Sequence, residues 1–199
     1  MRDIFLEAIK QLEYEDDLFQ AGLAAKVTLA TSLETWAVAP AVGQKLYELV
    51  LQYQPQQIVE VGTSLGYSTM WMAEAARSYG GKIITLEHES SKIAKTQKLF
   101  EDLELQQTVT LVHTDAKEFL KNYTEKIDFL FLDALKREYI EYLKLAEKNL
   151  AAGSLVLADD VITWRRKLDD FFHYLETSGK YKTQVFELGH GLLFAEKIS

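Results

Sequence analysis

The stretch from residue 57 to residue 76 constrains the fold more than any other part of the chain. A short β-branched run, Ile58, Val59 and Val61, is typical of a strand buried on both faces. Gly62 and Gly66 follow, and residues 70–76 are again apolar with helical spacing. Glycines let the backbone approach a ligand closely, and a helix N-terminus offers free N–H groups. The stretch therefore predicts a strand, a glycine turn and a helix, as in nucleotide-binding βα units.

The glycine spacing differs from the dinucleotide fingerprint. The pattern is Glu60-x-Gly62-x-x-x-Gly66, with an acid two residues before the first glycine and no glycine where a pyrophosphate would approach. An NAD dehydrogenase is accordingly the weakest of the enzyme hypotheses. A structural glycine turn without a ligand remains the alternative at this point.

Length and composition set further bounds. A chain of 199 residues fits one domain, which we expect to comprise an N-terminal helical cover (1–35) and a core (36–199). The chain has no cysteine, and its net charge of −8 argues against a protein that coats nucleic acid. The sequence shows no signal-peptide layout and no run long enough to span a bilayer, so we expect a cytoplasmic protein without membrane partners.

Strand and helix patterns alternate along the rest of the chain. Strands are predicted at 58–61, 82–86, 108–112, 127–132, 154–158, 180–187 and 192–196, and helices at 2–19, about 18–32, 40–51, 70–76, 91–103, 117–122, 137–150 and 165–177. This alternation predicts parallel βαβ units with right-handed crossovers, and the closely spaced last two strands predict an antiparallel pair. The expected fold is a doubly wound, mostly parallel, seven-stranded Rossmann-like sheet with an antiparallel last strand and extra N-terminal helices.

Ligands of an open α/β sheet bind outside the carboxyl ends of its strands. Glu87 follows the second strand, roughly twenty residues after the glycine turn, where an acid can accept ribose hydroxyls. The alternative is an acid that merely begins a loop. His88 could stack on an adenine, whereas we expect His113 to belong to packing. Asp115 could serve the adenine edge or equally cap the helix after it.

Acids also follow the fourth and fifth strands. Asp133, Asp159 and Asp160 should converge at neighbouring strand ends, where three carboxylates repel one another unless a cation neutralises them. All-oxygen ligation suits Mg²⁺ or Ca²⁺. The alternative is that each acid caps a helix.

Together these residues resemble a known family, the cation-dependent, class I S-adenosylmethionine-dependent O-methyltransferases of the catechol and caffeoyl-coenzyme A type. The resemblance extends from residue 36 to about residue 163 and includes the last strand pair. Its elements are Trp36-Ala37-Val38, Gly43-Gln44, the motif at 60–68, Leu86-Glu87, the motif at 128–139 and the motif at 157–161.

The resemblance implies an enzyme that methylates a hydroxyl of a small catechol-like or vicinal-diol acceptor. It implies that Asp133, Asp159 and Asp160 bind Mg²⁺, or another divalent cation such as Ca²⁺ or Mn²⁺. Lys136 would be the general base, with a pKa lowered by burial and by the cation.

The resemblance also implies a binding site for S-adenosylmethionine. The residues that would contact the cofactor are Val38, Glu60, Gly62, Ser64, Gly66, Tyr67, Ser68, Glu87, His88, Asp115, Ala116 and Asp133. Within this set, Ser68 and the backbone near Val38 would hold the amino-acid end. Glu87 would bind the ribose, and Asp115 with Ala116 the adenine.

The sequence departs from the family in two places. Gly189-His190-Gly191 replaces the Gly-Asp-Gly of many members, and the segment after Asp160 runs almost directly into a helix, which predicts an open site. An open site and the basic residues 165–167 permit a second acceptor, a hydroxylated tRNA nucleoside, although the overall acidity weighs against it. A third hypothesis is a non-catalytic S-adenosylmethionine-binding protein. A homodimer is the expected oligomeric state.

Overall fold

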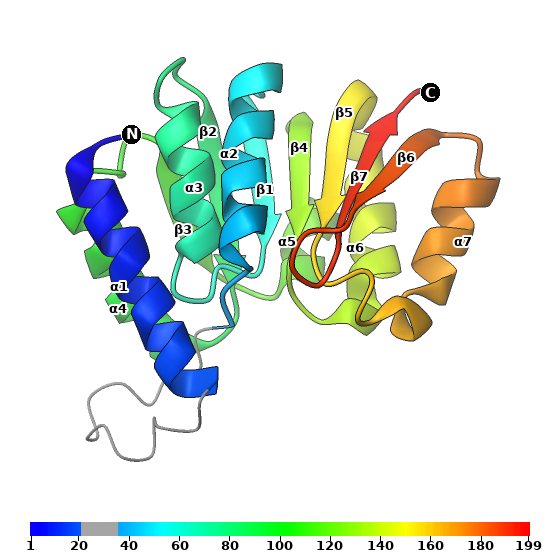
Figure 1. Ribbon diagram of the computed structural model, residues 1–199. Helices are drawn as coiled ribbons and strands as arrows, with labels where there is room; N and C mark the ends of the chain where they lie inside the picture. The colour runs from blue at the N-terminus through cyan, green and yellow to red at the C-terminus, as the bar shows by residue number, and fades with distance from the viewer. Residues whose placement is uncertain (21–35) are drawn as a thin grey trace.

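The computed structural model describes residues 1–20 and 36–199. Its centre is a seven-stranded sheet with the strand order β3-β2-β1-β4-β5-β7-β6 (Figure 1). The strands are β1 (Gln57–Val61), β2 (Lys82–Glu87), β3 (Val109–His113), β4 (Ile127–Leu132), β5 (Leu150–Ala158), β6 (Tyr181–Phe186) and β7 (Leu192–Lys197). β1 to β5 pair in parallel, whereas β7 pairs antiparallel with both β5 and β6. The predicted fold class is confirmed.

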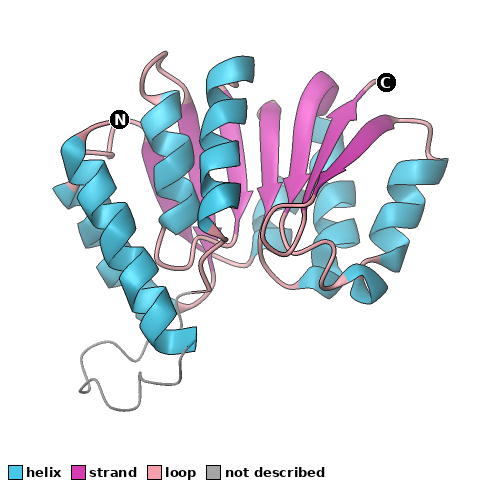
Figure 2. Ribbon diagram, viewed as in Figure 1, coloured by secondary structure: helices cyan, strands magenta, loops and turns pink. Residues whose placement is uncertain are grey.

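Helices cover both faces of this sheet (Figure 2). They are α1 (Asp3–Gln20), α2 (Pro40–Tyr53), α3 (Tyr67–Ala76), α4 (Ser90–Asp102), α5 (Ala116–Asn122), α6 (Tyr139–Ala146) and α7 (Asp169–Thr177), with 3₁₀ turns η2 (Lys136–Glu138), η3 (Glu147–Asn149) and η4 (Arg165–Lys167). Pro40 is the first residue of α2, as predicted. The helix expected over 18–32 lies, from residue 21 onward, outside the described residues. None of the described helices is long and apolar enough to cross a membrane.

The core lies on both faces of the sheet. Phe129 and Phe131 of β4 pack on the face covered by α1 to α4, whereas Leu130 and Leu132 pack on the face covered by α6 and α7. Successive side chains of a strand point to opposite faces, so a continuous apolar run such as β4 requires cover on both sides. This burial fixes the carboxyl ends of β1, β4 and β5 side by side.

The predicted boundaries of three elements are wrong. The helix expected over 137–150 is divided into η2, α6 and η3, and β5 begins at Leu150 instead of residue 154. Leu150 already pairs with Ile127 of β4, and a register irregularity lets the strand continue through Gly153, whose φ is +86°. The helix expected over 165–177 likewise begins as η4, and α7 starts only at Asp169.

Candidate active site

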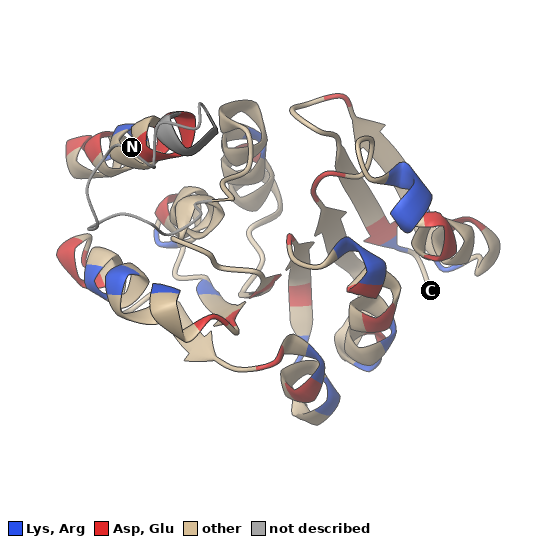
Figure 3. Ribbon diagram, turned by 90° about the horizontal axis from the view of Figure 1, so that it is seen from below, with Lys and Arg blue, Asp and Glu red and all other residues tan. Residues whose placement is uncertain are grey.

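Three aspartates meet at the carboxyl edge of the sheet. Asp133 follows β4, and Asp159 and Asp160 follow β5, which is the neighbouring parallel strand. One carboxylate oxygen from each lies within 4.8 Å of the others. Figure 3 looks onto this edge and shows the acidic strand ends next to each other. The structure thus brings together the three residues predicted to bind a metal ion.

Asp159 is the most constrained of the three. It is 3% exposed, and its Oδ1 is buried without a hydrogen-bond partner among the described residues. Burial, together with the charges of Asp133 and Asp160, raises the pKa of Asp159 to about 8. Burial also raises the pKa of Asp133, although Lys136 opposes that effect. The arrangement therefore disfavours three ionised carboxylates unless more positive charge is present.

Lys136 supplies one positive charge to this cluster. Its Nζ lies 2.9 Å from Asp133 Oδ1 and 2.9 Å from Asp160 Oδ2. Burial lowers the pKa of Lys136, but Asp133 and Asp160 outweigh burial, so the pKa lies above its ordinary value. Without a cation, the ammonium group itself balances two carboxylates, and the lowered pKa that we expect with a bound cation stays a prediction.

Tyr139 is a residue of this site to which the sequence analysis gave no role. It is fully buried, and its Oη donates a 3.3 Å hydrogen bond to the backbone oxygen of Asp159. Lys136 Nζ lies 5.3 Å from the centre of the same ring. The three-residue spacing of Lys136 and Tyr139, which places side chains on one face of a helical turn, was the available signal.

The donor set fits a divalent cation. Carboxylate oxygens are the preferred ligands of Mg²⁺ and Ca²⁺, and an unpartnered, buried Asp159 Oδ1 is an acceptor that no described group satisfies. Three acids against one lysine also leave a formal charge of −2, which a divalent cation would balance.

The glycine turn lies directly beside these acids. Gly62 has a φ of +102°, and a Cβ at this position would lie 2.1 Å from the backbone oxygen of Asp133. Gly66 has a φ of +85°, and a Cβ there would lie 2.6 Å from the ring of Phe100. Only glycine fits both constraints, namely the left-handed backbone and the close approach. The turn therefore runs tightly between the end of β4 and α4.

Glu87 joins the turn to the end of β2. The backbone N–H of Ser64 donates to Glu87 Oε2 at 2.8 Å, and that of Glu89 donates to Oε1 at 2.8 Å. Each oxygen keeps a second lone pair for a ligand hydroxyl. The structure thus joins Ser64 of the glycine turn directly to Glu87.

Glu60 lies beneath the turn and is completely buried. It accepts hydrogen bonds from Ser68 and Thr69 at 2.5 Å each and from Thr85 at 2.6 Å. Burial raises the pKa of Glu60 to about 7, although these hydroxyls oppose the shift. Glu60 therefore joins β1 to β2 and to the start of α3, where Ser68 lies.

Other predicted cofactor residues are more scattered. Val38 is buried, and Tyr67 donates its hydroxyl to Glu13 of α1 at 2.6 Å. The side chain of His88 is 76% exposed. His113 is exposed, and its Nε2 lies 3.1 Å from the backbone oxygen of His88, so the packing role expected for it is wrong.

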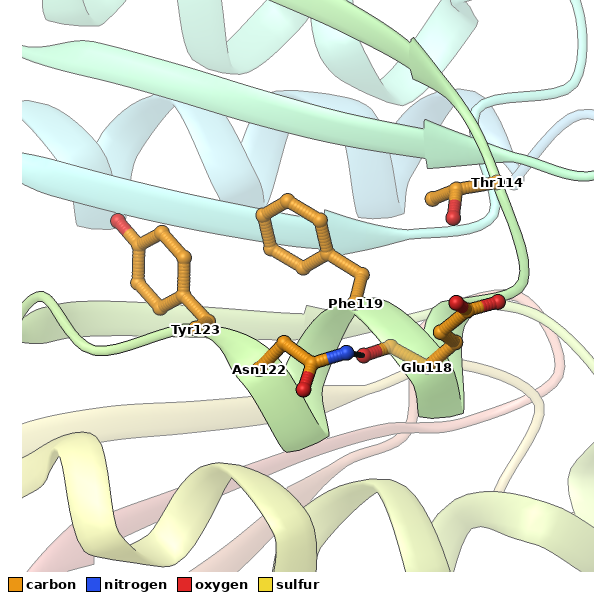
Figure 4. A pocket seen from close by; sticks show the side chains of 5 residues that line it. All are labelled: Thr114, Glu118, Phe119, Asn122 and Tyr123. Atoms are coloured by element: carbon orange, nitrogen blue, oxygen red, sulfur yellow. Dashed lines mark hydrogen bonds between the residues drawn. The ribbon is translucent and has the colours of Figure 1, made fainter.

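Asp115 has the capping role that was left open for it. Its Oδ1 accepts from the backbone N–H groups of Lys117 at 2.8 Å and Glu118 at 3.0 Å, and Ala116 begins α5. Beside it, a pocket of about 320 Å³ extends from Thr114 along α5 to Tyr123 (Figure 4). None of the three aspartates lines this pocket. It is therefore separate from the acidic cluster.

The Gly189-His190-Gly191 segment supports the loop after Asp160. The backbone oxygen of His190 accepts from the N–H of Ile162 at 2.9 Å, and His190 Nδ1 lies 3.1 Å from Thr163 Oγ1. A Cβ at Gly191 would lie 2.4 Å from Ile162. The departure from Gly-Asp-Gly therefore affects this loop and none of the three aspartates.

A family model and several known proteins match this chain. Residues 59–161 match the family model described as a methyltransferase domain. A catechol O-methyltransferase of Niastella koreensis is 36% identical over 164 residues, which are 80% of this chain and 72% of the relative. The Bos taurus catechol O-methyltransferase is 29% identical over 160 residues, and the match spans 76% of this chain but only 58% of that protein.

Solved structures share the fold. A Podospora anserina methyltransferase, crystallised with S-adenosylhomocysteine, aligns with a TM-score of 0.81 at 19% identity, covering 100% of this chain and 89% of the other. An O-methyltransferase structure from Klebsiella pneumoniae, described as putative, also gives a TM-score of 0.81, at 21% identity, covering 100% and 91%. By family model, relatives and fold, the chain belongs to the class I S-adenosylmethionine-dependent O-methyltransferases.

Proposed function

We propose that the chain is a divalent-cation-dependent enzyme that transfers the methyl group of S-adenosylmethionine to a hydroxyl of a catechol-like or vicinal-diol acceptor. The observation that carries the proposal is the buried Asp159 Oδ1, which has no described partner and lies beside two further carboxylates. Leaving such a group unsatisfied costs about 1–3 kcal/mol or more. A bound cation would remove that cost.

Each residue of the cluster has a role in this proposal. Asp133, Asp159 and Asp160 would hold the cation, with Mg²⁺ as our first choice and Ca²⁺ or Mn²⁺ as alternatives. When bound, the cation lowers the pKa of a coordinated hydroxyl, and S-adenosylmethionine supplies the methyl group. Lys136 now balances Asp133 and Asp160 as an ammonium group, with Nζ 2.9 Å from each. If a cation balanced these carboxylates instead, the pKa of Lys136 would fall, and Nζ as the free amine would accept the hydroxyl proton.

The cofactor would bind along the glycine turn. Ser64 and Glu87, which are already hydrogen-bonded to each other, would receive the ribose, while Ser68 would lie at the amino-acid end. Gly62 lets the turn pass close to Asp133, so the sulfonium would lie near the acidic cluster. Proximity of donor and acceptor contributes up to about 7–11 kcal/mol in favourable cases.

The surface around the cluster supports an aromatic acceptor. Trp36, Leu135, Ile162 and Trp164 are 61%, 49%, 50% and 39% exposed. All four lie on segments at the carboxyl edge, and Gly189 joins two of these segments because a Cβ there would lie 2.6 Å from Ala39 Cβ. Exposed apolar side chains gathered at one place are typical of a binding surface.

The decisive experiment is calorimetric titration with Mg²⁺ and with S-adenosylmethionine, followed by a methyl-transfer assay with a neutral catechol. We expect wild type to bind both and Asp159→Asn to lose the heat of Mg²⁺ binding. Asp170→Asn, which removes an exposed acid of α7, is the matched control and should behave like wild type. Cofactor binding without any response to the metal would contradict the proposed chemistry.

Three further expectations remain predictions. A hydroxylated tRNA nucleoside is the alternative acceptor, and labelled tRNA in the same assay would reveal it. A homodimer can be tested by light scattering. The cytoplasmic location can be tested by fractionation.

A further inference from the structure

Two basic segments flank the acidic cluster in a chain that is acidic overall. The chain has a net charge of −8, yet Lys136 and Arg137 follow β4 within η2, and Arg165, Arg166 and Lys167 form η4. Figure 3 shows both basic segments at the carboxyl edge, near the acidic strand ends. Positive charge is therefore concentrated where an acceptor would enter.

The η4 segment is held close to the aspartates by backbone hydrogen bonds. The N–H of Trp164 donates to the oxygen of Asp160 at 3.0 Å, and the N–H of Lys167 donates to the oxygen of Trp164 at 2.8 Å. The preceding loop is tied down by Ile162, which donates to His190. The position of η4 relative to Asp160 is consequently fixed.

Two of the three cations in η4 are already engaged. Arg165 pairs with Asp169 at 2.6 Å and lies 4.0 Å from the centre of the Phe172 ring. Lys167 Nζ lies 3.9 Å from the centre of the Trp164 ring. The exposed side chain of Arg166 makes no hydrogen bond or ion pair with any described residue.

Arg137, on the other side of the cluster, is in the same situation. It is exposed, and within residues 1–20 and 36–199 its side chain has no hydrogen bond or ion pair. The acid next to it, Glu138, is engaged by Tyr142 at 2.7 Å and by Lys117 at 3.4 Å. Asp170 and Glu187 are exposed acids of the same edge, and neither pairs with Arg137 or Arg166.

The acidic cluster itself gives an anion no attraction. Its formal charge of −2 becomes zero when a divalent cation binds. Free guanidinium groups, in contrast, bind carboxylates and phosphates through paired hydrogen bonds. We propose that the methyl acceptor carries an anionic group, a carboxylate or a phosphate, and that Arg166 and Arg137 bind it. This inference rests on the proposed function.

A small anionic acceptor agrees better with these charges than RNA does. Binding RNA requires many phosphate contacts by Lys and Arg, and each phosphate would approach a protein of net charge −8. Two arginines whose side chains have no partner among the described residues suffice for one carboxylate or phosphate group.

The test compares three acceptors that share the catechol ring, 3,4-dihydroxybenzoate, 3,4-dihydroxyphenylphosphonate and neutral 3,4-dihydroxybenzamide. We expect wild type to have a lower KM for the two anions. Arg166→Gln and Arg137→Gln should raise KM for the anions by about tenfold, which corresponds to about 1.4 kcal/mol of lost binding free energy. Their kcat, and their KM for the amide, should not change. A larger effect with the phosphonate than with the benzoate would identify phosphate as the preferred group.

Lys182→Gln is the matched control. Lys182 is an exposed residue near the start of β6, at the opposite edge of the sheet, so the variant removes the same charge far from the site. A KM increase in this variant equal to that in Arg166→Gln would overturn the proposal, because the effect would then come from the net charge of the protein and not from a specific anion site. Equal KM values for the three acceptors in wild type, or methylation of tRNA alone, would also overturn it.

A second readout needs no turnover. Benzoate, but not benzamide, should shift the side-chain ¹⁵Nε signals of Arg166 and Arg137, assigned through the two glutamine variants. If these signals shift while wild type with Mg²⁺ methylates none of the three acceptors, the anion site stands and the proposed O-methyltransferase function fails. If the amide is methylated and the signals do not move, the function stands and the anion site fails.

Discussion

The two edges of the sheet carry charge clusters of opposite design. At the carboxyl edge, Lys136 is the one cation among three described carboxylates, and Asp159 Oδ1 has no described partner. At the amino edge, the single carboxylate of Glu147 accepts hydrogen bonds from Lys180 at 2.7 Å, from Tyr174 at 2.8 Å and from Tyr181 at 3.0 Å. The carboxyl-edge cluster lacks positive charge, whereas both carboxylate oxygens of Glu147 at the amino edge have hydrogen-bond donors.

The pKa shifts express the same difference. Burial raises the pKa of Asp159 to about 8, and the neighbouring carboxylates add to the shift. Burial also tends to raise the pKa of Glu147, but Lys180, Tyr174 and Tyr181 outweigh it, so the pKa of Glu147 is lowered. Ionised Glu147 therefore stabilises the fold, whereas ionised Asp159 destabilises it. The carboxyl-edge cluster is therefore suited to binding a positively charged ligand, and the amino-edge cluster stabilises the fold.

The largest expected effect comes from breaking the first cluster. Asp159→Asn should lower methyl transfer by at least about 100-fold, because even residues that only support metal ligands cost 10–100-fold when replaced. Glu147→Gln should leave kcat within a factor of two of wild type. Steady-state assays with Mg²⁺ would measure both. Full activity in Asp159→Asn would contradict the view that the carboxyl-edge cluster, and not the Glu147 cluster, serves catalysis.

Metal binding should stabilise only proteins with an intact first cluster. At a Mg²⁺ concentration of 100 Kd, wild type should gain about 2.7 kcal/mol of unfolding free energy. EDTA should reverse the gain, Glu147→Gln should show the same gain, and Asp159→Asn should show none. Differential scanning calorimetry would measure it. An equal gain in Asp159→Asn would place the cation elsewhere.

Tyr139→Phe sharpens the comparison by removing a single contact of the first cluster. The variant keeps the ring beside Lys136 but loses the hydrogen bond to the backbone of Asp159. If the hydrogen bond contributes about 0.5–1.5 kcal/mol to stabilising the transition state, its loss should lower kcat by about two- to tenfold. The KM for S-adenosylmethionine should not change. Tyr142→Phe, which loses a hydrogen bond to Glu138, is the control. An equal decrease of kcat in both variants would indicate that the packing of α6 is disturbed, and would contradict a specific role of the Tyr139 hydrogen bond.

A final effect concerns stability and its pH dependence without metal. Glu147→Gln should lower the unfolding free energy by about 1.5–3 kcal/mol at pH 7. Because the folded-state pKa of Glu147 is lowered, this contribution is present above pH 4.5 and disappears as the pH falls through the folded pKa. Asp159 has the opposite sign, so its ionisation costs stability as the pH rises from about 4 to 8. Urea unfolding in EDTA from pH 4 to pH 8 would show the two trends, and parallel curves for Asp159→Asn and wild type would contradict the second.

Local sequence patterns predicted most of the architecture. The β-branched run of β1, the apolar run of β4 and Pro40 at the start of α2 lie where they were expected. Each depends on side-chain periodicity or on a backbone restriction within a few residues. The boundaries of β5 and α7 could not be predicted in this way, because Leu150 belongs to the strand only through its pairing with β4.

The site shows the same division. Asp133, Asp159 and Asp160 were identified because each follows a predicted strand, and adjacent parallel strands bring their ends together. The pKa direction of Lys136 and the role of Tyr139 could not be predicted, because both depend on side-chain distances. The Glu147 cluster, which joins η3, α7 and β6, leaves no signal in any one segment.

Local sequence sufficed for which elements form and which residues follow the strands, because apolar periodicity, glycine and proline act on the nearest few residues. The placement of β7 between β5 and β6, and the lack of a described partner for Asp159 Oδ1 and for the side chains of Arg137 and Arg166, came from the packed fold. Charge interactions depend on distance and burial in space, and packing of the sheet and helices sets both.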